Sequence, residues 1–317
     1  MKIMSRELSI KRMLRGSEMG LLEAYKNLAG KNAVIVGGAG GIVGRAVTLG
    51  LASAGINIAT CDCDEEAVHA IVADVEAFGS KITSVHADVA DSRALDRFYD
   101  QVEHDFDHID IVVNVVGGLQ RRYFMETTRE QNLLEIRLNY GYVIDSMRRA
   151  IPLIRKGGKG GSIINFTTIE AHRGAATYAV YAGAKAATTN FSRAMALELG
   201  AEHIRVNLIA PDTNPAKTSN AALRPEDFSR LADLGNDYSV FDRAFEMYIP
   251  LKEAPSVDDI VNAVLFLASD LSRSITGTTL HVDGGTSAAL GFIDWPYGDG
   301  YMPAPLGGTL KKLFSME

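Results

Sequence analysis

Short apolar runs alternate with longer amphipathic stretches from residue 32 onward. The short runs are rich in valine and isoleucine, which is typical of strands buried on both faces of a parallel sheet. In the longer stretches the apolar residues recur with helical spacing. We predict strands at 32–36, 56–61, 82–86, 109–115, 162–166, 205–209 and 278–282. We predict helices at 43–54, 65–78, 92–106, 129–154, 178–199 and 258–268.

This alternation predicts an α/β fold, namely a doubly wound seven-stranded parallel sheet with helices on both faces. Right-handed crossovers bring the carboxyl ends of the strands to one edge of the sheet, where ligands bind. We expect one domain over residues 31–285, with an insert or lid at about 212–250. We also expect a helical arm at 1–30, for which a transit peptide is the alternative, and a C-terminal extension at 286–317.

Composition and charge narrow the classes of partner. The 317 residues are 47% hydrophobic and 22% charged, as expected of a folded chain with a large core. A formal net charge of -7 argues against nucleic acid or an anionic membrane as partner. No apolar run reaches the roughly 18 residues of a membrane helix. Cys61 and Cys63 are too close for an ordinary disulfide and too few for a zinc site. We therefore expect a cytoplasmic protein without a metal.

A glycine-rich turn joins the first predicted strand to the first predicted helix. It reads Gly37-Gly38-Ala39-Gly40-Gly41-Ile42-Val43-Gly44. Glycine permits positive φ angles and close backbone approach, and a helix N-terminus presents free N–H groups to an anion. A tight structural turn is the alternative, but the strand-turn-helix context favours a dinucleotide. The residues that we expect to hold its pyrophosphate are Gly38, Gly41, Ile42, Val43 and Gly44.

Asp62 ends the second predicted strand, 18 residues after Gly44. A carboxylate at this place accepts hydrogen bonds from the ribose hydroxyls of a dinucleotide and repels a 2′-phosphate. We therefore expect NAD rather than NADP as the cofactor. The alternative is that Asp62 caps the next helix.

Tyr181 and Lys185 are four residues apart and share one face of a predicted helix. A free tyrosine has a pKa near 10 and is a poor proton carrier at neutral pH. A close lysine cation stabilises the phenolate and lowers that pKa. The pair therefore predicts a tyrosine that exchanges a proton with an alcohol or a carbonyl; a surface helix pair is the alternative.

Taken in order along residues 30–285, these motifs resemble the short-chain dehydrogenase/reductase family. The resemblance implies a single-domain, NAD(P)-binding Rossmann fold. Further residues that carry it are Asp88-Val89, Asn114–Gly117, Asn139, Thr168, Ile204–Asn207, Pro211 and Asp283–Gly285.

The resemblance implies a role for each of these positions. Tyr181 would be the acid-base residue, and Lys185 would bind the nicotinamide ribose and lower the pKa of the phenol. Thr168, where the family usually has serine, would hold the substrate oxygen; its neighbour Thr167 is the less favoured alternative. Asn139 would hold a water in a proton relay through Lys185.

The remaining positions would contact the cofactor. By the same resemblance, Asp88 and Val89 would contact the adenine, Asn114 and Gly117 would lie along the cofactor, and Pro211 and Thr213 would flank the nicotinamide. The chain departs from the family where Gly37 replaces threonine in the turn and where Asp212 replaces the glycine after Pro211.

The sequence thus predicts an NAD-dependent oxidoreductase that interconverts a secondary alcohol and a ketone. Tyr178 lies seven residues before Lys185, which is the spacing of related enoyl reductases, so reduction of a carbon–carbon double bond is an alternative. A non-catalytic NAD-binding sensor is another. Candidate substrate contacts are His172, Tyr178 and Arg121. We expect a small-molecule substrate and, from the family, a homodimer or homotetramer.

Overall fold

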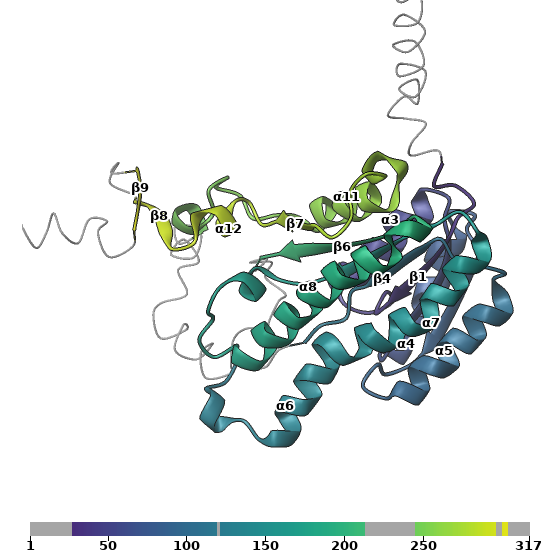
Figure 1. The fold of residues 1–317 in the computed structure, drawn as a ribbon, viewed down its shortest axis with the longest axis horizontal. Helices are drawn as coiled ribbons and strands as arrows, with labels where there is room; N and C mark the ends of the chain where they lie inside the picture. Colours follow the sequence, from purple (N-terminus) through teal and green to yellow (C-terminus); the bar gives the residue numbers. More distant parts are fainter. Residues whose placement is uncertain (1–26, 119–120, 213–244, 296–299, 304–317) are drawn as a thin grey trace, which may run out of the picture.

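Seven parallel strands form the central sheet of the computed structural model (Figure 1), which describes residues 27–118, 121–212, 245–295 and 300–303. The strand order is β3-β2-β1-β4-β5-β6-β7, and every neighbouring pair is parallel. The order reverses between β1 and β4, which confirms the doubly wound sheet that the sequence predicts. The strands are β1 (Asn32–Val36), β2 (Asn57–Asp62), β3 (Ile82–His86), β4 (Ile111–Asn114), β5 (Gly161–Phe166), β6 (Ile204–Pro211) and β7 (Thr279–Val282).

Helices cover both faces of this sheet and bury one hydrophobic cluster on each (Figure 1). The first cluster lies under α5 (Ser92–Asp105), α7 (Tyr142–Gly157) and α8 (Ala179–Leu199), with Phe98 and Tyr142 fully buried in it. The second lies under the three helices α3 (Ile42–Ser53), α4 (Glu65–Glu76) and α11 (Val257–Ala268). Strands buried on both faces explain why the apolar runs are continuous rather than alternating.

The helix predicted at 129–154 differs most from the sequence prediction. The structure has α6 (Arg129–Ile136), one π-helical turn at Arg137–Gly141, and then α7. The π turn changes the hydrogen bonding from i→i+4 to i→i+5 over one turn, which the sequence analysis does not predict. The strand predicted at 109–115 pairs with its neighbours over Ile111–Asn114 only.

Two features flank the sheet beyond β7. A short helix, α12 (Thr286–Ala289), precedes an antiparallel pair formed by β8 (Phe292–Trp295) and β9 (Gly300–Pro303). An ion pair joins Asp294 in β8 to Lys252. Short connecting turns complete the described elements: 3-10 turns at Phe124–Glu126, Ile169–His172, Gly200–Glu202 and Asp270–Ser272.

Parts of three segments predicted as additions to the domain lie outside the described residues. They are residues 1–26 of the arm, 213–244 of the insert, and 296–299 and 304–317 of the C-terminal extension. Within the described part of the chain, no helix combines the length and apolar character needed to cross a membrane.

Candidate active site

The carboxyl edge of the sheet brings most of the predicted site residues together. The glycine turn follows β1, Asp62 ends β2, Gly117 follows β4 and Thr168 follows β5. They surround the point between β1 and β4 where the strand order reverses, which is where open α/β sheets bind ligands.

The glycine turn has the geometry that a pyrophosphate cradle needs. Gly37 and Gly41 have φ angles of 86° and 62°, which side-chain-bearing residues rarely adopt. A Cβ on Gly44 would lie 1.9 Å from the carbonyl oxygen of Gly37. Helix α3 begins at Ile42 and no side chain caps its N-terminus. The first N–H groups of the helix, those of Ile42 and Val43 included, therefore suit an anionic group.

Asp62 lies against the same turn. Its Oδ2 accepts a hydrogen bond of 2.8 Å from the N–H of Gly40. The cap of helix α4 is Asp64, whose side chain accepts from the N–H of Ala67. Asp62 is therefore not the helix cap that the sequence left open as the alternative. Its carboxylate stands where an adenosine ribose would reach a dinucleotide turn.

The two residues predicted to contact the adenine, Asp88 and Val89, differ in exposure. Asp88 is exposed, and its Oδ1 accepts the N–H of Ala90 at 2.8 Å. The side chain of Val89 is 4% exposed and packs in the first hydrophobic cluster. Only the backbone of Val89 is therefore left to contact a ligand.

The side chain of Asn114 is completely buried, so only its backbone could contact a cofactor. Its Nδ2 donates to Asn165 at 2.8 Å, and its Oδ1 accepts from Ser146 at 2.7 Å. Ser146 also pairs with the hydroxyl of Tyr99, and Asn165 donates to Ser192. The side chain of Asn114 therefore ties β4 to β5 and α7 beneath the site.

Gly117, Lys185 and Asn139 meet directly after β4. A Cβ on Gly117 would lie 3.0 Å from Nζ of Lys185 and 3.2 Å from Oδ1 of Asn139. Lys185 is buried and donates to the carbonyl of Phe166 at 3.0 Å. Asn139 lies in the π turn and donates to the carbonyl of Gly118 at 2.7 Å. The absence of a side chain at residue 117 thus lets the lysine and the asparagine reach the same place.

Tyr181 and Thr168 form the second half of the site. Their side chains are hydrogen-bonded, and this contact opposes the effect of burial, which raises the pKa of Tyr181 to about 12. Thr168 is 5% exposed and lies at the end of β5. Thr167 points away, because its hydroxyl bonds Thr189 at 2.8 Å against helix α8. The geometry favours Thr168 over Thr167 as the hydroxyl beside Tyr181.

Burial acts on the pKa values of both Lys185 and Tyr181. Burial lowers the pKa of Lys185 to about 8 and raises that of Tyr181. The ammonium faces the backbone carbonyls of Phe166 and Val116, at 3.0 and 3.4 Å. Burial is the largest effect on both groups, and the lowering of the phenol pKa by this cation stays a prediction.

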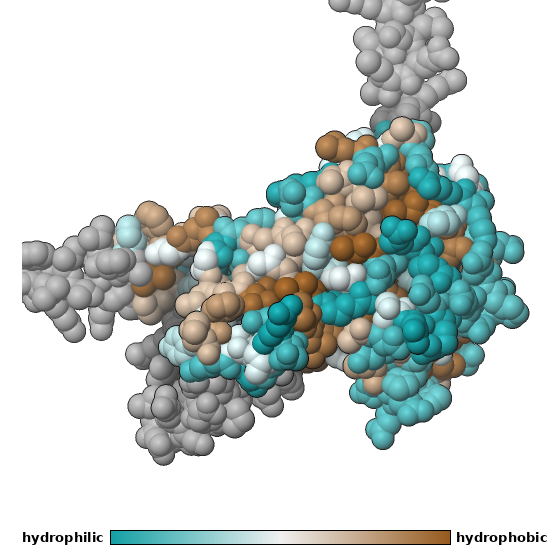
Figure 2. Space-filling model, turned by 60° about the horizontal axis from the view of Figure 1, so that its bottom comes forward, coloured by the Kyte–Doolittle hydropathy of each residue, from teal (hydrophilic) through white to brown (hydrophobic). Residues whose placement is uncertain are grey.

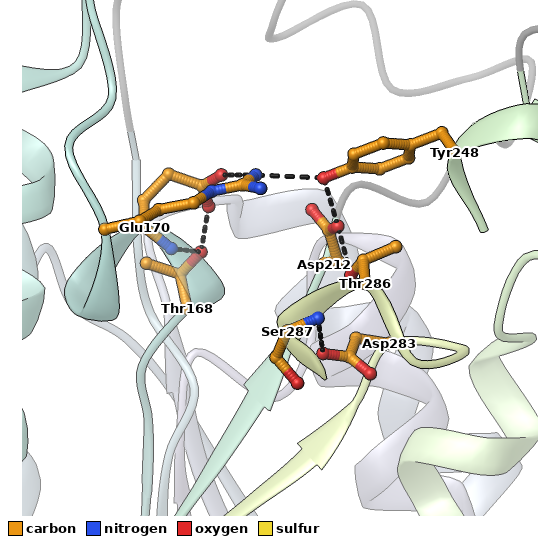
Figure 3. Close-up of polar contacts among 8 residues, drawn as sticks. Thr168, Glu170, Asp212, Tyr248, Asp283, Thr286 and Ser287 are labelled. Carbon is orange, nitrogen blue, oxygen red and sulfur yellow. Dashed lines mark hydrogen bonds and ion pairs between the residues drawn. The ribbon is translucent and has the colours of Figure 1, made fainter. Parts of the chain in front are cut away.

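A polar chain that the sequence did not predict connects Thr168 to the far side of the crevice (Figure 3). Thr168 donates to Oε2 of Glu170 at 2.5 Å, and Nη2 of Arg173 donates to Oε1 of Glu170 at 2.7 Å. The same Nη2 donates to the hydroxyl of Tyr248 at 2.9 Å. That hydroxyl donates to Asp212 at 2.7 Å. Five side chains from three separate segments thus meet at the carboxyl edge of the sheet.

Asp212 is the residue that replaces the family's glycine after Pro211. Its carboxylate is the last acceptor in this series of hydrogen bonds. Its Oδ2 also accepts the hydroxyl of Thr286 at 2.6 Å (Figure 3). Asp283 supports the same turn by accepting the N–H of Ser287 at 2.9 Å. Pro211 ends β6 beside it, whereas Thr213 lies outside the described residues.

Two of the three candidate substrate contacts lie at a hollow of about 540 Å³ beside this polar chain. His172 and Tyr178 line it, together with Glu170, Arg173 and Leu290. The ring of His172 lies 5.1 Å from that of His281, and burial chiefly lowers the pKa of His172. Arg121 does not line this hollow; its Nε donates to Thr177 at 3.3 Å.

Known proteins of similar sequence cover most of the chain. The family described as enoyl-(acyl carrier protein) reductase matches residues 38–287. The 2,3-dihydro-2,3-dihydroxybenzoate dehydrogenase of Bacillus subtilis (strain 168) is 32% identical over 83% of this chain and 98% of its own. A 3-oxoacyl-(acyl-carrier-protein) reductase of Staphylococcus epidermidis is 30% identical over 80% of this chain and 98% of its own.

A solved structure agrees with these relatives. Carveol dehydrogenase from Mycobacterium avium, in complex with NAD, is 29% identical and superposes with a TM-score of 0.72. The superposition covers 81% of this chain and 98% of that one. The match over residues 38–287, the seven-stranded sheet and these relatives show that the chain belongs to the short-chain dehydrogenase/reductase family of NAD(P)-binding oxidoreductases.

Proposed function

We propose that the chain is an NAD-dependent oxidoreductase that interconverts a secondary alcohol and a ketone. The observation that carries this proposal is the hydrogen bond between Tyr181 and Thr168 at the carboxyl end of β5. Two hydroxyl groups that meet at a ligand edge can hold one substrate oxygen between them. Lys185 and Asn139 lie around Gly117 on the cofactor side of the same edge.

The roles of Tyr181 and Lys185 follow from their pKa values. A bound nicotinamide would supply the hydride acceptor or donor. Tyr181, with a pKa near 12, keeps its proton at neutral pH and donates it to the oxygen of a ketone. Lys185, with a pKa near 8, exchanges protons close to neutral pH and suits the next step of a relay. Asn139 fixes the loop beside that lysine through its bond to Gly118.

Asp62 supports NAD rather than NADP as the cofactor. Its carboxylate lies 2.8 Å from the N–H of Gly40, within the turn that suits the pyrophosphate. The side chains of Asp64 and Glu65, two and three positions after it, are exposed and add negative charge. A 2′-phosphate would meet repulsion from all three carboxylates. The carveol dehydrogenase of similar structure was solved with NAD.

The substrate of the proposed reaction is a small alcohol or ketone bound in the hollow beside Tyr178 and His172. Oxidation of a panel of secondary alcohols, followed as NADH formation, tests the proposal. The Tyr181→Phe variant should lose turnover and keep NADH binding. Full turnover in that variant would refute the role of the phenol.

Reduction of a carbon–carbon double bond is the second candidate, because the matching family is described as an enoyl reductase. It would use Tyr178, which stands at the start of α8 and lines the hollow. A comparison of Tyr178→Phe with Tyr181→Phe separates the two reactions. An NAD-binding sensor without turnover is the third candidate, and it predicts tight NADH binding with no activity on either substrate class.

We further propose that the chain works as a homodimer or homotetramer in the cytoplasm. Apolar side chains are exposed on α6 and α8, with Leu133 at 55% and Leu197 at 85%. Figure 2 shows such apolar surface in brown patches among the hydrophilic teal. Sedimentation velocity of the full chain measures the state of assembly. Cys61 and Cys63 are both free, which suits a reducing compartment.

A further inference from the structure

Leu290 stands in a backbone conformation that leucine rarely adopts. It ends α12 with φ 37° and ψ 50°, in the left-handed region, and its N–H donates to the carbonyl of Thr286 at 3.2 Å. Many helices end with a left-handed residue, but that residue is usually glycine, because a Cβ crowds the following carbonyl oxygen. A leucine at this position therefore costs folding free energy.

The side chain of Leu290 does not offset that cost by packing in the core. It is 55% exposed and belongs to neither hydrophobic cluster of the sheet. It lines the hollow of about 540 Å³ beside the polar chain instead. Among the described residues around this hollow, it is the one aliphatic side chain larger than alanine. An apolar side chain that is held at a cost on the wall of a cavity points to contact with a ligand.

Contacts on both sides of Leu290 anchor the backbone around it. One turn before it, the hydroxyl of Thr286 donates to Asp212 at 2.6 Å (Figure 3). Strand β8 begins two residues after it and is joined to Lys252 by the ion pair of Asp294. The leucine is thus presented to the hollow from an anchored segment, which limits the entropy lost when a ligand contacts it.

The hollow adjoins the hydroxyl groups that we propose to hold the substrate oxygen. Glu170 lines the hollow and is hydrogen-bonded to Thr168 at 2.5 Å. Tyr178 also lines it and stands three residues before Tyr181, at the start of α8. A substrate whose oxygen lies between Thr168 and Tyr181 can therefore extend one of its carbon substituents into the hollow, toward Leu290.

We propose that Leu290 is a specificity-determining residue whose side chain contacts an apolar substituent on the carbinol carbon, so that the substrates are secondary alcohols or ketones with a ring or a branched alkyl group there. This inference rests on the proposed alcohol–ketone function and names the substrate class of that same site. Leu290 lies beyond residues 38–287, over which the family matches, so the family match does not account for it.

Two probes that share a carbinol and a methyl group, and differ in the second substituent, test the contact. They are 1-cyclohexylethanol and propan-2-ol. Saturation-transfer NMR measures their dissociation constants on the full chain, with and without NADH. Leu290→Ala should weaken the binding of 1-cyclohexylethanol about tenfold, because the ring loses apolar surface to bury against. The dissociation constant of propan-2-ol, which lacks the ring, should stay within about twofold.

Two further variants control for the loss of a leucine. Leu290→Met keeps an apolar side chain of similar volume and should keep most of the selectivity. Leu251→Ala should leave both dissociation constants unchanged, because Leu251 is also exposed, at 76%, but does not line the hollow. An equal loss for both probes in Leu290→Ala, or the same selective loss in Leu251→Ala, would overturn the proposal. A wild-type chain that binds 1-cyclohexylethanol no better than propan-2-ol would overturn it as well.

Thermal unfolding shows whether the leucine serves the fold or the ligand. Leu290→Gly should raise Tm by about 2 °C, because glycine adopts the left-handed conformation without strain. The same variant should weaken the binding of 1-cyclohexylethanol as Leu290→Ala does. A lower Tm in Leu290→Gly would show that the side chain stabilises the fold, which contradicts the proposal.

The outcomes separate this inference from the proposed function. The binding measurements need no turnover, so a selective loss of 1-cyclohexylethanol in Leu290→Ala supports the contact even if no alcohol is oxidised. Oxidation of alcohols by a chain whose probe selectivity does not change in Leu290→Ala supports the reaction and refutes the role of Leu290.

Discussion

The N–H of Gly40 donates a hydrogen bond of 2.8 Å to the carboxylate of Asp62, which joins the end of β2 to the turn after β1. A Cβ on Gly40 would lie only 2.9 Å from Oδ1 of Asp62. The carboxylate is thus held against the backbone that suits the dinucleotide phosphates. In the proposed complex with NAD, this contact would place a fixed negative charge beside the 2′-position of the adenosine ribose.

Replacing that charge should relax the choice of cofactor. In Asp62→Asn we expect the preference for NADH over NADPH to fall at least about tenfold, because the repulsion of the 2′-phosphate is removed. Fluorescence titration of both reduced cofactors measures the two dissociation constants. The exposed neighbour Glu65→Gln is the control and should change the ratio much less. A wild-type chain that binds NADPH as tightly as NADH would contradict this prediction.

Lys185→Met should make the protein more stable and less active. The folded pKa of Lys185 is about 8 and the unfolded pKa is about 10.4. Between these two pH values the unfolded chain holds a proton that the folded chain lacks, so the free energy of unfolding rises with pH. The destabilising effect of the buried, charged lysine is therefore largest below pH 8. We expect the variant to be about 1–3 kcal/mol more stable at pH 7.

That gain should shrink as pH rises from about 8 toward 10. Urea denaturation at pH 7 and at higher pH measures it. The exposed Lys81→Met serves as the comparison and should show no such pH-dependent gap. If the Lys185→Met gap grew with pH, the assignment of a lowered lysine pKa would be wrong.

Tyr248→Phe should loosen the polar chain that reaches Thr168. It removes the hydroxyl that accepts from Arg173 and donates to Asp212. We expect the free energy of unfolding to fall by about 1–2 kcal/mol and KM for the substrate to rise, with NADH binding unchanged. Tyr140→Phe is the matched control, since the described residues supply no partner for that hydroxyl and its ring contact with Phe191 remains. Equal effects of the two variants would contradict the assigned role.

Asn114→Ala should damage stability more than cofactor binding. The side chain is fully buried and bonds both Asn165 and Ser146. Its removal leaves those two groups short of a partner in the interior, at a cost of about 2–4 kcal/mol. Thermal unfolding and NADH titration of the same preparation separate the two effects. A large loss of NADH affinity with unchanged stability would return Asn114 to the cofactor face.

The sequence predicts the sheet well, both for the buried strand β1 and for the partly buried edge strand β3. The bounds of β1 and β3, at Asn32–Val36 and Ile82–His86, match the prediction to the residue. A capping box of Ser256 and Asp259 begins α11, in agreement with the helix predicted at 258–268. These features depend on local pattern alone, which one chain displays in full.

What the sequence misses depends on contacts between distant residues. Arg173 and Tyr248 are 75 positions apart, with the insert between them, and no periodicity links them. The lowered pKa of Lys185 comes from burial that only the folded chain creates. The π turn at Arg137–Gly141 lies within one long predicted helix, and the sequence analysis does not predict it. Motifs thus predict which residues meet at the carboxyl edge of the sheet, whereas the burial of Lys185 and the contacts of Arg173 arise only in the folded chain.

The central claim is that the phenol of Tyr181 moves the proton while a nicotinamide exchanges the hydride. The most direct measurement is single-turnover NADH formation by the wild type and by Tyr181→Phe, with NADH affinity measured on the same samples. We expect the variant to bind NADH within about twofold of the wild type and to lose turnover by at least about a hundredfold. Turnover that survives in Tyr181→Phe, with binding intact, would contradict the account.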